Sequence, residues 1–254
     1  MTAGAPRLSA VIITRDEEGN LPACLASLRG LVDEIVVLDA GSTDATVSIA
    51  QSAGARVERR PFAGFGAAKQ AALEMASGEW VLSVDADERV TPALAAEIRG
   101  VRDDGRGPAG YLVRREVFFL GRRLRFGGMS HDWVLRLFRR EAGRFSTDRV
   151  HERVLVPGRP GRLSGTLLHH PYRSLAVHVE KMNRYTELQA DAFLARGKRY
   201  RAWMWLRLPW KMFARLVLRL GVLDGTPGVL FATMSAYSSW LKYAKTWRGD
   251  EESR

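Results

Sequence analysis

The feature that most constrains the fold is an alternation of apolar runs and helical patterns over residues 8–99. Mostly apolar runs occupy residues 8–14, 34–38 and 80–84, and a short strand is also expected at residues 56–60, where the sequence is RVERR. Strands that alternate with helices predict βαβ units and a parallel sheet. Because these runs are apolar on both faces, the sheet is expected to be covered by helices on both sides.

Polar side chains follow three of these predicted strands, at the point where each strand ends. Thr14 and Arg15 close the first strand, Asp39 closes the second, and Asp85 and Asp87 follow the run that begins at Trp80. The carboxyl ends of parallel strands meet at one edge of a sheet, and ligands bind beyond that edge. The five side chains are therefore expected to converge on one site.

Asp85 and Asp87 form the candidate metal site. Side chains two residues apart in an extended chain point the same way, so both carboxylates are expected to face one ligand. Mg²⁺ and Mn²⁺ prefer oxygen ligands, and Mg²⁺ sites commonly combine one or two carboxylates with substrate phosphates. A lone Asp-x-Asp more often caps a turn and the following helix, so the metal hypothesis depends on the other two strands.

Residues 39–44, with the sequence DAGSTD, predict a sharp turn from strand to helix. Free backbone N–H groups in such a turn suit a phosphate or a nucleoside, and Thr43 or Asp44 is also expected to cap the helix. The turn lacks the Gly-x-Gly-x-x-Gly pattern of dinucleotide sites, and the chain contains no Gly-Lys-Ser/Thr. Neither NAD binding nor a Walker loop is therefore expected.

The pattern changes beyond residue 99. A charged, glycine-rich linker is expected at residues 102–108, and four strand-like runs follow it in a mixed or antiparallel half. They occupy residues 111–120, 133–138, 150–156 and 163–169. Ser174 is then the predicted N-cap of a long helix that extends to about residue 196.

The predicted fold class is therefore α/β, with a Rossmann-like, mostly parallel sheet. We expect a nucleotide-binding half at residues 1–100, an acceptor half at residues 101–197, and a basic, helical C-terminal region at residues 198–254. The hinge between the two halves is the expected acceptor cleft.

The chain is strongly basic, with 39 Lys and Arg against 28 Asp and Glu, a net charge of +11 and a pI near 10.4. Such a balance favours nucleic acid, an anionic membrane or phosphorylated substrates as partners. The one cysteine, Cys24, excludes an internal disulfide and fits a reducing compartment, and the N-terminal sequence does not predict a signal peptide.

The C-terminal region interleaves basic and aromatic residues. Arg207, Lys211, Arg215 and Arg219 recur every four residues, which predicts a basic stripe along one helix face. Tryptophan and leucine residues between them, such as Trp210, predict an interfacial membrane helix. The alternatives are a helical appendage packed on the rest of the protein, or nucleic-acid binding, for which no recognition fold is evident. Residues 225–241 fall short of a membrane span.

Three ordered signatures in the first half of the chain resemble those of glycosyltransferase family 2. They are the segments IITRDE at residues 12–17, VVLDAGSTD at residues 36–44 and DAD at residues 85–87. The usual Asn-Glu of the first signature is Asp16-Glu17 here. Later segments resemble the branch of lipopolysaccharide core β-1,4-glucosyltransferase-like proteins: VHE at residues 150–152, HHPYRSL at residues 169–175 and GVLDG at residues 221–225.

The resemblance implies a GT-A fold and transfer of a sugar, such as glucose, from a UDP-sugar to a glycolipid acceptor of the lipopolysaccharide inner core. Inverting transfer with Mg²⁺ or Mn²⁺ is expected, at the cytoplasmic face of the cell membrane. The enzyme would be peripheral on an anionic membrane surface, with no nucleic-acid partner.

The resemblance also implies roles for the residues at the predicted sheet edge. Asp87 would contact the metal, and Asp85 the ribose or a metal-bound water. Asp39 would accept a hydrogen bond from N3–H of uracil. Thr14, Arg15 and Glu17 would line the nucleoside pocket. Lys69 either reaches the diphosphate as a point charge or is a solvated helix lysine.

The catalytic base is expected to be Glu152, with Asp132 as the alternative. Positive neighbours on both sides of Glu152 keep a carboxylate ionised, as a base must be before it accepts a proton. A structural, salt-bridged glutamate is the competing interpretation. His169 is a candidate third metal ligand, because imidazole is an acceptable ligand for Mn²⁺, although a single histidine is more often structural.

Two other functions share some of these sequence features. A nucleotidyltransferase can share this sheet and an acidic site, but it requires a glycine-rich, basic loop after the first strand, where this chain is acidic at residues 16–18. A non-catalytic membrane or nucleic-acid-binding module would show no metal-dependent binding of UDP.

Overall fold

The computed structural model describes residues 7–104, 106–129, 132–146, 153–172 and 174–247. The chain forms two compact units. Unit 1 contains the described residues up to Arg115 and from Asp132 to His169, and unit 2 contains those of 116–131 and from His170 onward. The predicted domain border between residues 197 and 198 stays a prediction, and residues 170–197 lie in unit 2 by their contacts.

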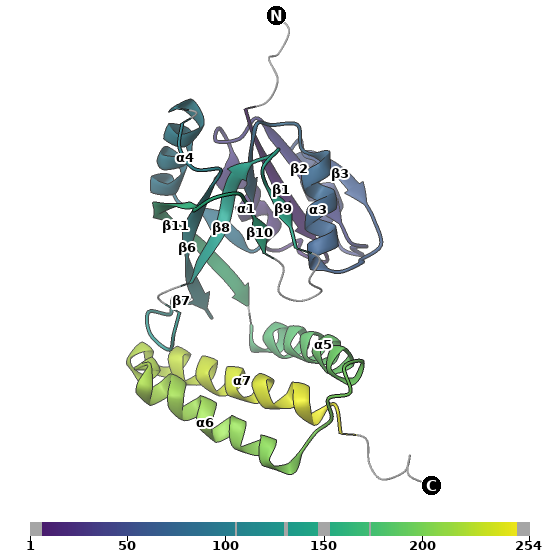
Figure 1. Cartoon of the computed structure of the whole chain (residues 1–254), viewed down its shortest axis with the longest axis vertical. Helices are drawn as coiled ribbons and strands as arrows, with labels where there is room; N and C mark the ends of the chain where they lie inside the picture. Colours follow the sequence, from purple (N-terminus) through teal and green to yellow (C-terminus); the bar gives the residue numbers. More distant parts are fainter. Residues whose placement is uncertain (1–6, 105, 130–131, 147–152, 173, 248–254) are drawn as a thin grey trace, which may run out of the picture. The chain divides into compact units, whose positions relative to one another are not determined.

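Unit 1 begins with the predicted parallel sheet. Strands β1 (Leu8–Thr14), β2 (Glu34–Asp39), β3 (Arg56–Arg59) and β4 (Trp80–Ser83) pair in the order β3-β2-β1-β4, and each pair is parallel. Figure 1 shows the sheet with its crossover helices. They are α1 (Leu21–Leu28), α2 (Thr46–Ser52) and α3 (Phe65–Met75).

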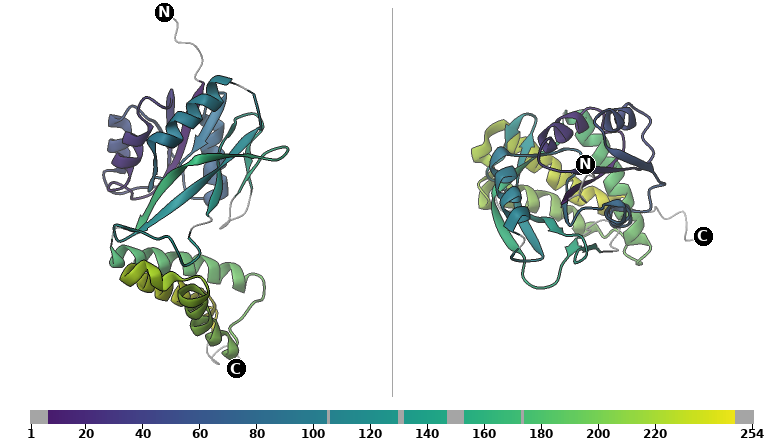
Figure 2. Two further views of the ribbon diagram at one scale, coloured as in Figure 1. Left: turned by 90° about the vertical axis from the view of Figure 1, so that its left-hand side faces the viewer. Right: turned by 90° about the horizontal axis from the view of Figure 1, so that it is seen from above.

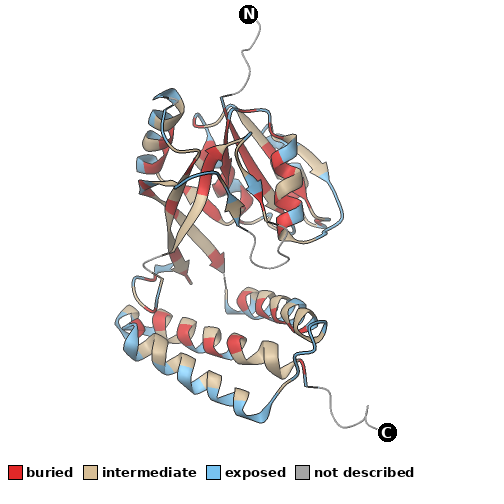
Figure 3. Cartoon of the chain, viewed as in Figure 1, coloured by how far each residue is buried: buried red, intermediate tan, exposed pale blue. Residues whose placement is uncertain are grey.

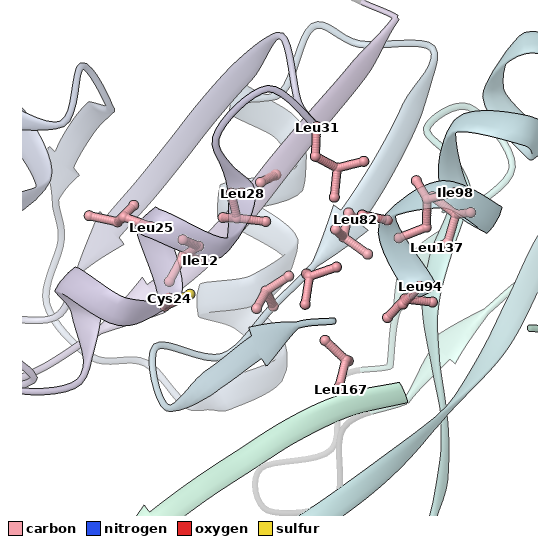
Figure 4. Packing of buried hydrophobic residues seen from close by; sticks show 14 of the residues in the cluster. Ile12, Cys24, Leu25, Leu28, Leu31, Leu82, Leu94, Ile98, Leu137 and Leu167 are labelled. Carbon is pink, nitrogen blue, oxygen red and sulfur yellow. The ribbon is translucent and has the colours of Figure 1, made fainter. Parts of the chain in front are cut away.

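Helices cover both faces of this sheet, as the apolar strands require. Along β1, Ala10 and Ile12 belong to one core cluster, whereas Val11 belongs to a second cluster on the opposite face. Side chains of α1 and α4 (Pro92–Asp104) fill the first cluster, and those of α3 fill the second. Figure 3 shows β1, β2 and β4 as mostly buried, and Figure 4 shows Ile12, Leu28 and Leu82 in the first cluster.

The rest of the sheet is antiparallel where its pairing is defined. β8 (Trp133–Arg139) pairs with β4, β6 (Gly110–Phe119) pairs with β8, and β5 (Glu88–Val90) pairs with β11 (Gly161–Tyr172). The full order is β3-β2-β1-β4-β8-β6-β11-β5, and β9 (Arg144–Phe145) with β10 (Val154–Leu155) forms a separate ribbon. The predicted α/β class with a mixed second half is confirmed.

Three local predictions differ from the structure. α4 continues to Asp104, through the start of the predicted linker, because Arg7 donates to the carbonyl of Arg102 at 2.8 Å and pairs with Asp103. β4 ends at Ser83, and the residues that follow form a turn rather than extended chain. Of the run predicted at residues 150–156, the structure describes residues 153–156, and Val154 and Leu155 form β10.

Unit 2 is a helical assembly. α5 (Leu175–Leu194), α6 (Arg207–Phe213) and α7 (Gly225–Ala244) are its main helices, and α7 contacts both α5 and α6. Figure 1 and the left view of Figure 2 show α7 lying along both helices. Short helical turns connect α5 to α7: η1 (Ala202–Leu206), the π-helix Ala214–Leu218, and η3 (Gly221–Asp224). The predicted helical C-terminal region is confirmed.

Two contacts define the ends of these helices. The hydroxyl of Ser174 accepts a hydrogen bond from the Val177 N–H at 3.2 Å, which confirms the predicted N-cap of α5. The carboxylate of Asp224, before α7, accepts hydrogen bonds from the N–H groups of Arg125 and Phe126, both at 2.9 Å. β7 (Arg122–Arg123) pairs with the end of β6 next to this contact.

The predicted basic stripe differs from the structure in two ways. The helical segment ends at Leu218, so Arg219 lies beyond it. The stripe also packs against α7: the guanidinium of Arg207 lies 4.7 Å from the ring centre of Tyr243, and that of Arg215 lies 5.2 Å from the ring centre of Phe231. Cation–π contacts with α7 therefore turn the basic side inward.

Among the described helices, none is by itself both long and apolar enough to cross a membrane. Taken together, the segments Ala202–Leu218 and Gly221–Ala244 are long and apolar enough for a membrane span, but the chain bends by 74° between them.

Candidate active site

The carboxyl edge of the parallel sheet brings together the first two predicted site strands. Thr14 lies opposite Asp39 in the β1–β2 register, and its hydroxyl donates to Asp39 Oδ1 at 3.3 Å. Both side chains are buried, Thr14 at 3% and Asp39 at 0% exposed. The parallel register thus places these two residues together, as the sequence predicts.

Asp39 organises the turn that follows it. Its Oδ2 accepts hydrogen bonds from the N–H groups of Gly41 at 3.1 Å and Ser42 at 3.0 Å, and its Oδ1 accepts from the hydroxyls of Ser42 and Thr14. These four bonds match the roughly four lone-pair positions of a carboxylate. Gly41 adopts φ +90°, a conformation that favours glycine, and so permits this tight turn.

The loop after β1 is fastened to the turn after β2. Asp16 donates its N–H to the Ser42 hydroxyl at 2.9 Å, and its Oδ1 accepts from the Thr43 N–H at 2.8 Å. Glu17 donates its N–H to the Thr46 hydroxyl at 2.8 Å and accepts from the Asn20 amide at 2.7 Å. Hydrogen bonds of Asp16 and Glu17 therefore stabilise the conformation of this loop.

The predicted pocket residues of this loop differ in their surroundings. Arg15 is exposed and lies 3.9 Å from the carboxylate of Asp16, so its guanidinium is accessible to a ligand. Glu17 is half-buried. The structure places both beside Thr14 at the sheet edge, as expected from the sequence.

Asp85 lies between two cations. Its Oδ1 is 2.9 Å from Lys69 Nζ, and its Oδ2 is 2.5 Å from Arg136 Nη2. Lys69 has only 8% of its side chain exposed, so the alternative of a solvated helix lysine is wrong. Burial by itself would raise the pKa of Asp85, but the charges of Arg136 and Lys69 outweigh it and hold that pKa well below its usual range.

A chain of ion pairs continues from Asp85 through the interior of unit 1. Arg136 Nη2 also lies 2.5 Å from Glu88 Oε1, and Arg115 bridges from Glu88 Oε1 at 3.3 Å to Asp132 Oδ2 at 2.8 Å. Glu88 is completely buried, and its Oε2 accepts from the Asp85 N–H at 3.0 Å. This second bond closes the turn that follows β4.

Sequence reasoning missed Arg136, Glu88 and Arg115 as members of the site. One signal for Arg136 was present, because a cation inside the apolar run at residues 133–138 has to find an anion. Its partner follows from the antiparallel register of β4 with β8, where Leu82 lies opposite Leu137. That pairing joins segments about 50 residues apart and is not evident from local pattern.

Asp87 lies in the turn after β4 and faces β11. Its Oδ1 is 3.5 Å from Nε2 of His169, which the β5–β11 register places opposite Glu88. Burial would lower the pKa of His169, but the carboxylate of Asp87 outweighs burial and raises that pKa. Asp87 and Asp85 therefore face different partners, whereas extended chain would have directed both to one ligand.

The Asp87–His169 pair fits a divalent cation. Two neighbouring ligands of an octahedral ion with bonds of about 2.1 Å lie about 3 Å apart, close to the separation found here. Among the described residues, no cluster of three or more His, Cys, Asp or Glu side chains is arranged to hold a metal.

The structure describes only one of the two candidates for the base, Asp132. Asp132 has 31% of its side chain exposed, and its Oδ2 accepts from both Nε and Nη2 of Arg115, at 2.9 and 2.8 Å. Glu152 lies outside the described residues, together with its basic neighbour Arg149. Its role as base stays a prediction.

The matching family model describes glycosyl transferase family 2 and covers residues 9–157. A lipopolysaccharide core biosynthesis glycosyltransferase, LpsC, of Rhizobium meliloti is 34% identical over 249 residues, which is 95% of this chain and 92% of that protein. An uncharacterized glycosyltransferase of Rickettsia typhi is 26% identical over 94% of this chain and 86% of that protein.

Two solved structures align with this chain, one over less than half of it and one over nearly all of it. Glucosyl-3-phosphoglycerate synthase of Mycobacterium tuberculosis, in complex with Mn²⁺ and UDP-glucose, matches with a TM-score of 0.37 and 30% identity over 44% of each chain. Residues 1–349 of TarS from S. aureus match with a TM-score of 0.47 and 15% identity over 94% of this chain and 91% of theirs.

Proposed function

The chain belongs to glycosyltransferase family 2, and on that premise we propose that it transfers a hexose from a UDP-sugar to a glycolipid acceptor. Family membership makes it a glycosyltransferase and decides against the nucleotidyltransferase and the non-catalytic module. The proposed acceptor is a lipopolysaccharide inner core, and the proposed donor sugar is glucose.

The observation that carries this proposal is the 34% identity with the R. meliloti lipopolysaccharide core glycosyltransferase over 95% of this chain. The match extends beyond the nucleotide-binding half into the regions where an acceptor would be selected. The proposed nucleotide site is supported by Thr14 and Asp39, which adjoin at the carboxyl edge of the sheet.

The nucleoside is proposed to bind over the two fastened loops. Thr14, Arg15 and Glu17 would line its pocket, and the exposed Arg15 is free to approach the ligand. A uracil N3–H bound to Asp39 would replace the hydrogen bond from the Ser42 hydroxyl, because the carboxylate is otherwise fully engaged. The hydrogen bond from uracil would offset the loss of the one from Ser42, so the number of hydrogen bonds to Asp39 would not change.

The diphosphate is proposed to lie next to Lys69, Asp85 and Asp87. Asp85 would receive the ribose hydroxyls or a metal-bound water, while Lys69 would neutralise phosphate charge. Asp87 and His169 would hold Mg²⁺ or Mn²⁺. When bound, the ion would stabilise the negative charge that develops on the departing UDP.

Inverting transfer requires the acceptor hydroxyl to attack on the face opposite the leaving UDP, with a base beside it. The acceptor hydroxyl forms the new bond to the anomeric carbon while the bond to the UDP oxygen breaks, and the hydroxyl proton passes to the base. Glu152 is the proposed base and Asp132 the alternative. Arg115 restrains one oxygen of Asp132.

A glycolipid acceptor also requires the enzyme to reach a membrane. We propose that the protein is peripheral on the cytoplasmic face of an anionic membrane. The basic C-terminal region supports this placement.

A donor screen tests the proposed reaction. The purified protein is incubated with UDP-glucose, UDP-galactose, UDP-N-acetylglucosamine or GDP-mannose, with Mg²⁺, Mn²⁺ or EDTA, and free nucleoside diphosphate is measured. The expected result is metal-dependent release of UDP from one UDP-sugar, increased by a lipopolysaccharide-core acceptor. Folded protein that releases no nucleotide from any donor would contradict the proposal.

A further inference from the structure

The basic charge of the chain is concentrated in unit 2. Residues 116–131 and 170–254 contain 18 Lys and Arg against 8 Asp and Glu, a net charge of +10. The remainder contains 21 Lys and Arg against 20 Asp and Glu, a net charge of +1. A field of one sign on one unit attracts anionic partners to that unit alone.

Unit 2 also carries most of the exposed apolar surface. Of the seventeen large hydrophobic residues that are exposed in the described chain, ten lie between residues 203 and 223. We call them the apolar ridge: Trp203, Trp205, Leu206, Trp210, Phe213, Val217, Leu218, Leu220, Val222 and Leu223. Clustered exposure on this scale marks an interaction surface.

The ridge and the cations lie on opposite sides of the same segment. Leu206, Trp210 and Phe213 follow helical spacing, and Trp210 is 64% exposed. Arg207 and Arg215, in contrast, pack over aromatic rings of α7. The apolar residues of this segment are thus exposed, whereas Arg207 and Arg215 are half-buried against α7. A helix in water normally has the reverse arrangement. Figure 3 shows α6 as a mixture of exposed and intermediate residues.

The cations around Lys211 are not paired with carboxylates in the part of the chain that the structure describes. Within the described residues, no ion pair joins Arg207, Lys211, Arg215, Arg219 or Lys242 to an acid. Burial lowers the pKa of Lys211, and the positive charges of Arg215, Lys242, Arg207 and Arg219 lower it further. Five mutually repelling cations are a favourable site for an anion.

We propose that unit 2 docks on an anionic phospholipid bilayer, with the apolar ridge in the interface and the phosphate headgroups at this cation cluster. Tryptophan is suited to the interface because its ring is apolar and its N–H is polar. Long Lys and Arg side chains can reach headgroups from a segment that lies at the membrane surface. Exposed cations at Arg196, Lys198, Arg199 and Arg201 extend the positive surface next to the ridge.

Charge favours a lipid surface over the other possible occupants. Two copies of a unit with a net charge of +10 would repel each other if their ridges faced. A nucleic acid would satisfy the cations but would leave the aliphatic residues Val217, Leu218 and Leu223 in water. The bilayer satisfies both parts of the surface. This inference deepens the membrane partner in the proposed function and does not depend on the reaction.

The first test measures binding of the full chain to vesicles, without any sugar donor. Vesicles of phosphatidylcholine alone are compared with vesicles that contain phosphatidylglycerol, by flotation. Strong binding to the anionic vesicles and weak binding to the neutral ones is expected, with loss in high salt. Equal binding to both, or none to either, would overturn the proposal whether or not the enzyme turns over a UDP-sugar.

Two pairs of variants locate the surface. Trp210→Ser with Phe213→Ser is expected to weaken binding at least tenfold, while Phe62→Ser with Leu155→Ser, two exposed apolar residues of unit 1, leaves it unchanged. Lys211→Gln with Lys242→Gln is expected to lower affinity for anionic vesicles roughly ten- to thirtyfold. Arg29→Gln with Arg159→Gln removes the same charge from unit 1 and should have little effect.

A third measurement needs no variant. In the wild-type protein, phospholipid brominated on its acyl chains is expected to quench tryptophan fluorescence on anionic vesicles. Absence of quenching despite vesicle binding would overturn insertion of the ridge. If the wild-type protein is a dimer and the double variant Trp210→Ser with Phe213→Ser is a monomer, the ridge binds a second copy of the chain. If RNA competes with vesicles and still binds the same double variant, the cations bind nucleic acid. Either result would overturn the proposal.

Discussion

The two units of this chain handle charge and apolar surface in opposite ways. In unit 1 the buried cations Lys69 and Arg136 each meet a carboxylate, and the sheet is covered on both faces. In unit 2 the half-buried cations meet aromatic rings, and tryptophans such as Trp210 are exposed. A net charge of +11 therefore describes neither unit.

The difference teaches where each kind of chemistry is expected. Paired charges in a closed interior hold side chains in fixed positions, as a site for a nucleotide sugar requires. Unpaired charges beside exposed apolar residues remain available to an external partner.

The largest effect is expected at the proposed base. Glu152→Gln should reduce turnover by about 10³-fold, because a positioned carboxylate typically contributes 10²–10⁴-fold to proton transfer. Affinity for UDP should not change. Steady-state kinetics with the preferred donor measure the first quantity and calorimetric titration the second. Glu141→Gln, with a side chain that is 90% exposed, is the matched control. Full activity of Glu152→Gln would transfer the role to Asp132.

Stability provides the next test, because unit 1 depends on its buried pairs. Arg136→Met should lower the free energy of unfolding by about 3–5 kcal/mol, since it leaves Asp85 and Glu88 without their shared cation. Urea denaturation followed by circular dichroism measures the change. Arg60→Met, which removes an exposed partner of Glu58, should leave the transition in place. Equal effects of the two changes would contradict the contrast between buried and exposed pairs.

The same network predicts a dependence on pH. The pKa of Asp85 is lower in the folded state than the value of about 3.9 for an unfolded aspartate, so the folded state favours its ionised form. Its contribution is present above that unfolded value and is lost as the pH falls toward the folded one. The stability difference between wild type and Asp85→Asn should therefore be constant near neutrality and shrink below about pH 4. If the stability difference between wild type and Asp85→Asn grew as the pH fell, the folded state would not favour ionised Asp85, contrary to the prediction.

The smallest effect is expected at a helix end in unit 2. Ser174→Ala removes the N-cap of α5 and should cost about 1 kcal/mol of stability. Ser174→Asp should preserve most of it, because aspartate is also a good N-cap. Hydrogen exchange at the first turn of α5 measures the change locally. Faster exchange throughout unit 1 would show that the two units are coupled more strongly than their separate cores indicate.

The parts of the site that the sequence predicted depend on local pattern. Thr14 and Asp39 were predictable because each ends an apolar strand, and parallel pairing brings such ends together. Lys69 was left open between a diphosphate contact and a solvated lysine. Only the tertiary structure shows it buried against Asp85.

The parts that were missed depend on pairing between distant segments. Arg136 reaches Asp85 because β8 runs antiparallel to β4, and nothing in either run specifies that neighbour. The side chain of Glu88 accepts a hydrogen bond from the Asp85 N–H and closes the turn that contains Asp87. The chain is therefore not extended there, and Asp85 and Asp87 do not point the same way as the sequence pattern predicted. On α6, periodicity found the basic stripe, but only the packing against α7 shows which way it faces.

The central claim is that unit 1 binds a UDP-sugar through a divalent ion held at Asp87. Calorimetric titration of UDP into the wild-type protein and into Asp87→Asn, each with Mn²⁺ or with EDTA, tests it most directly. The account predicts that EDTA weakens binding to the wild type at least tenfold and that Asp87→Asn binds equally weakly with or without the ion. Wild-type affinity for UDP that is the same with Mn²⁺ as with EDTA, and unchanged in Asp87→Asn, would contradict it.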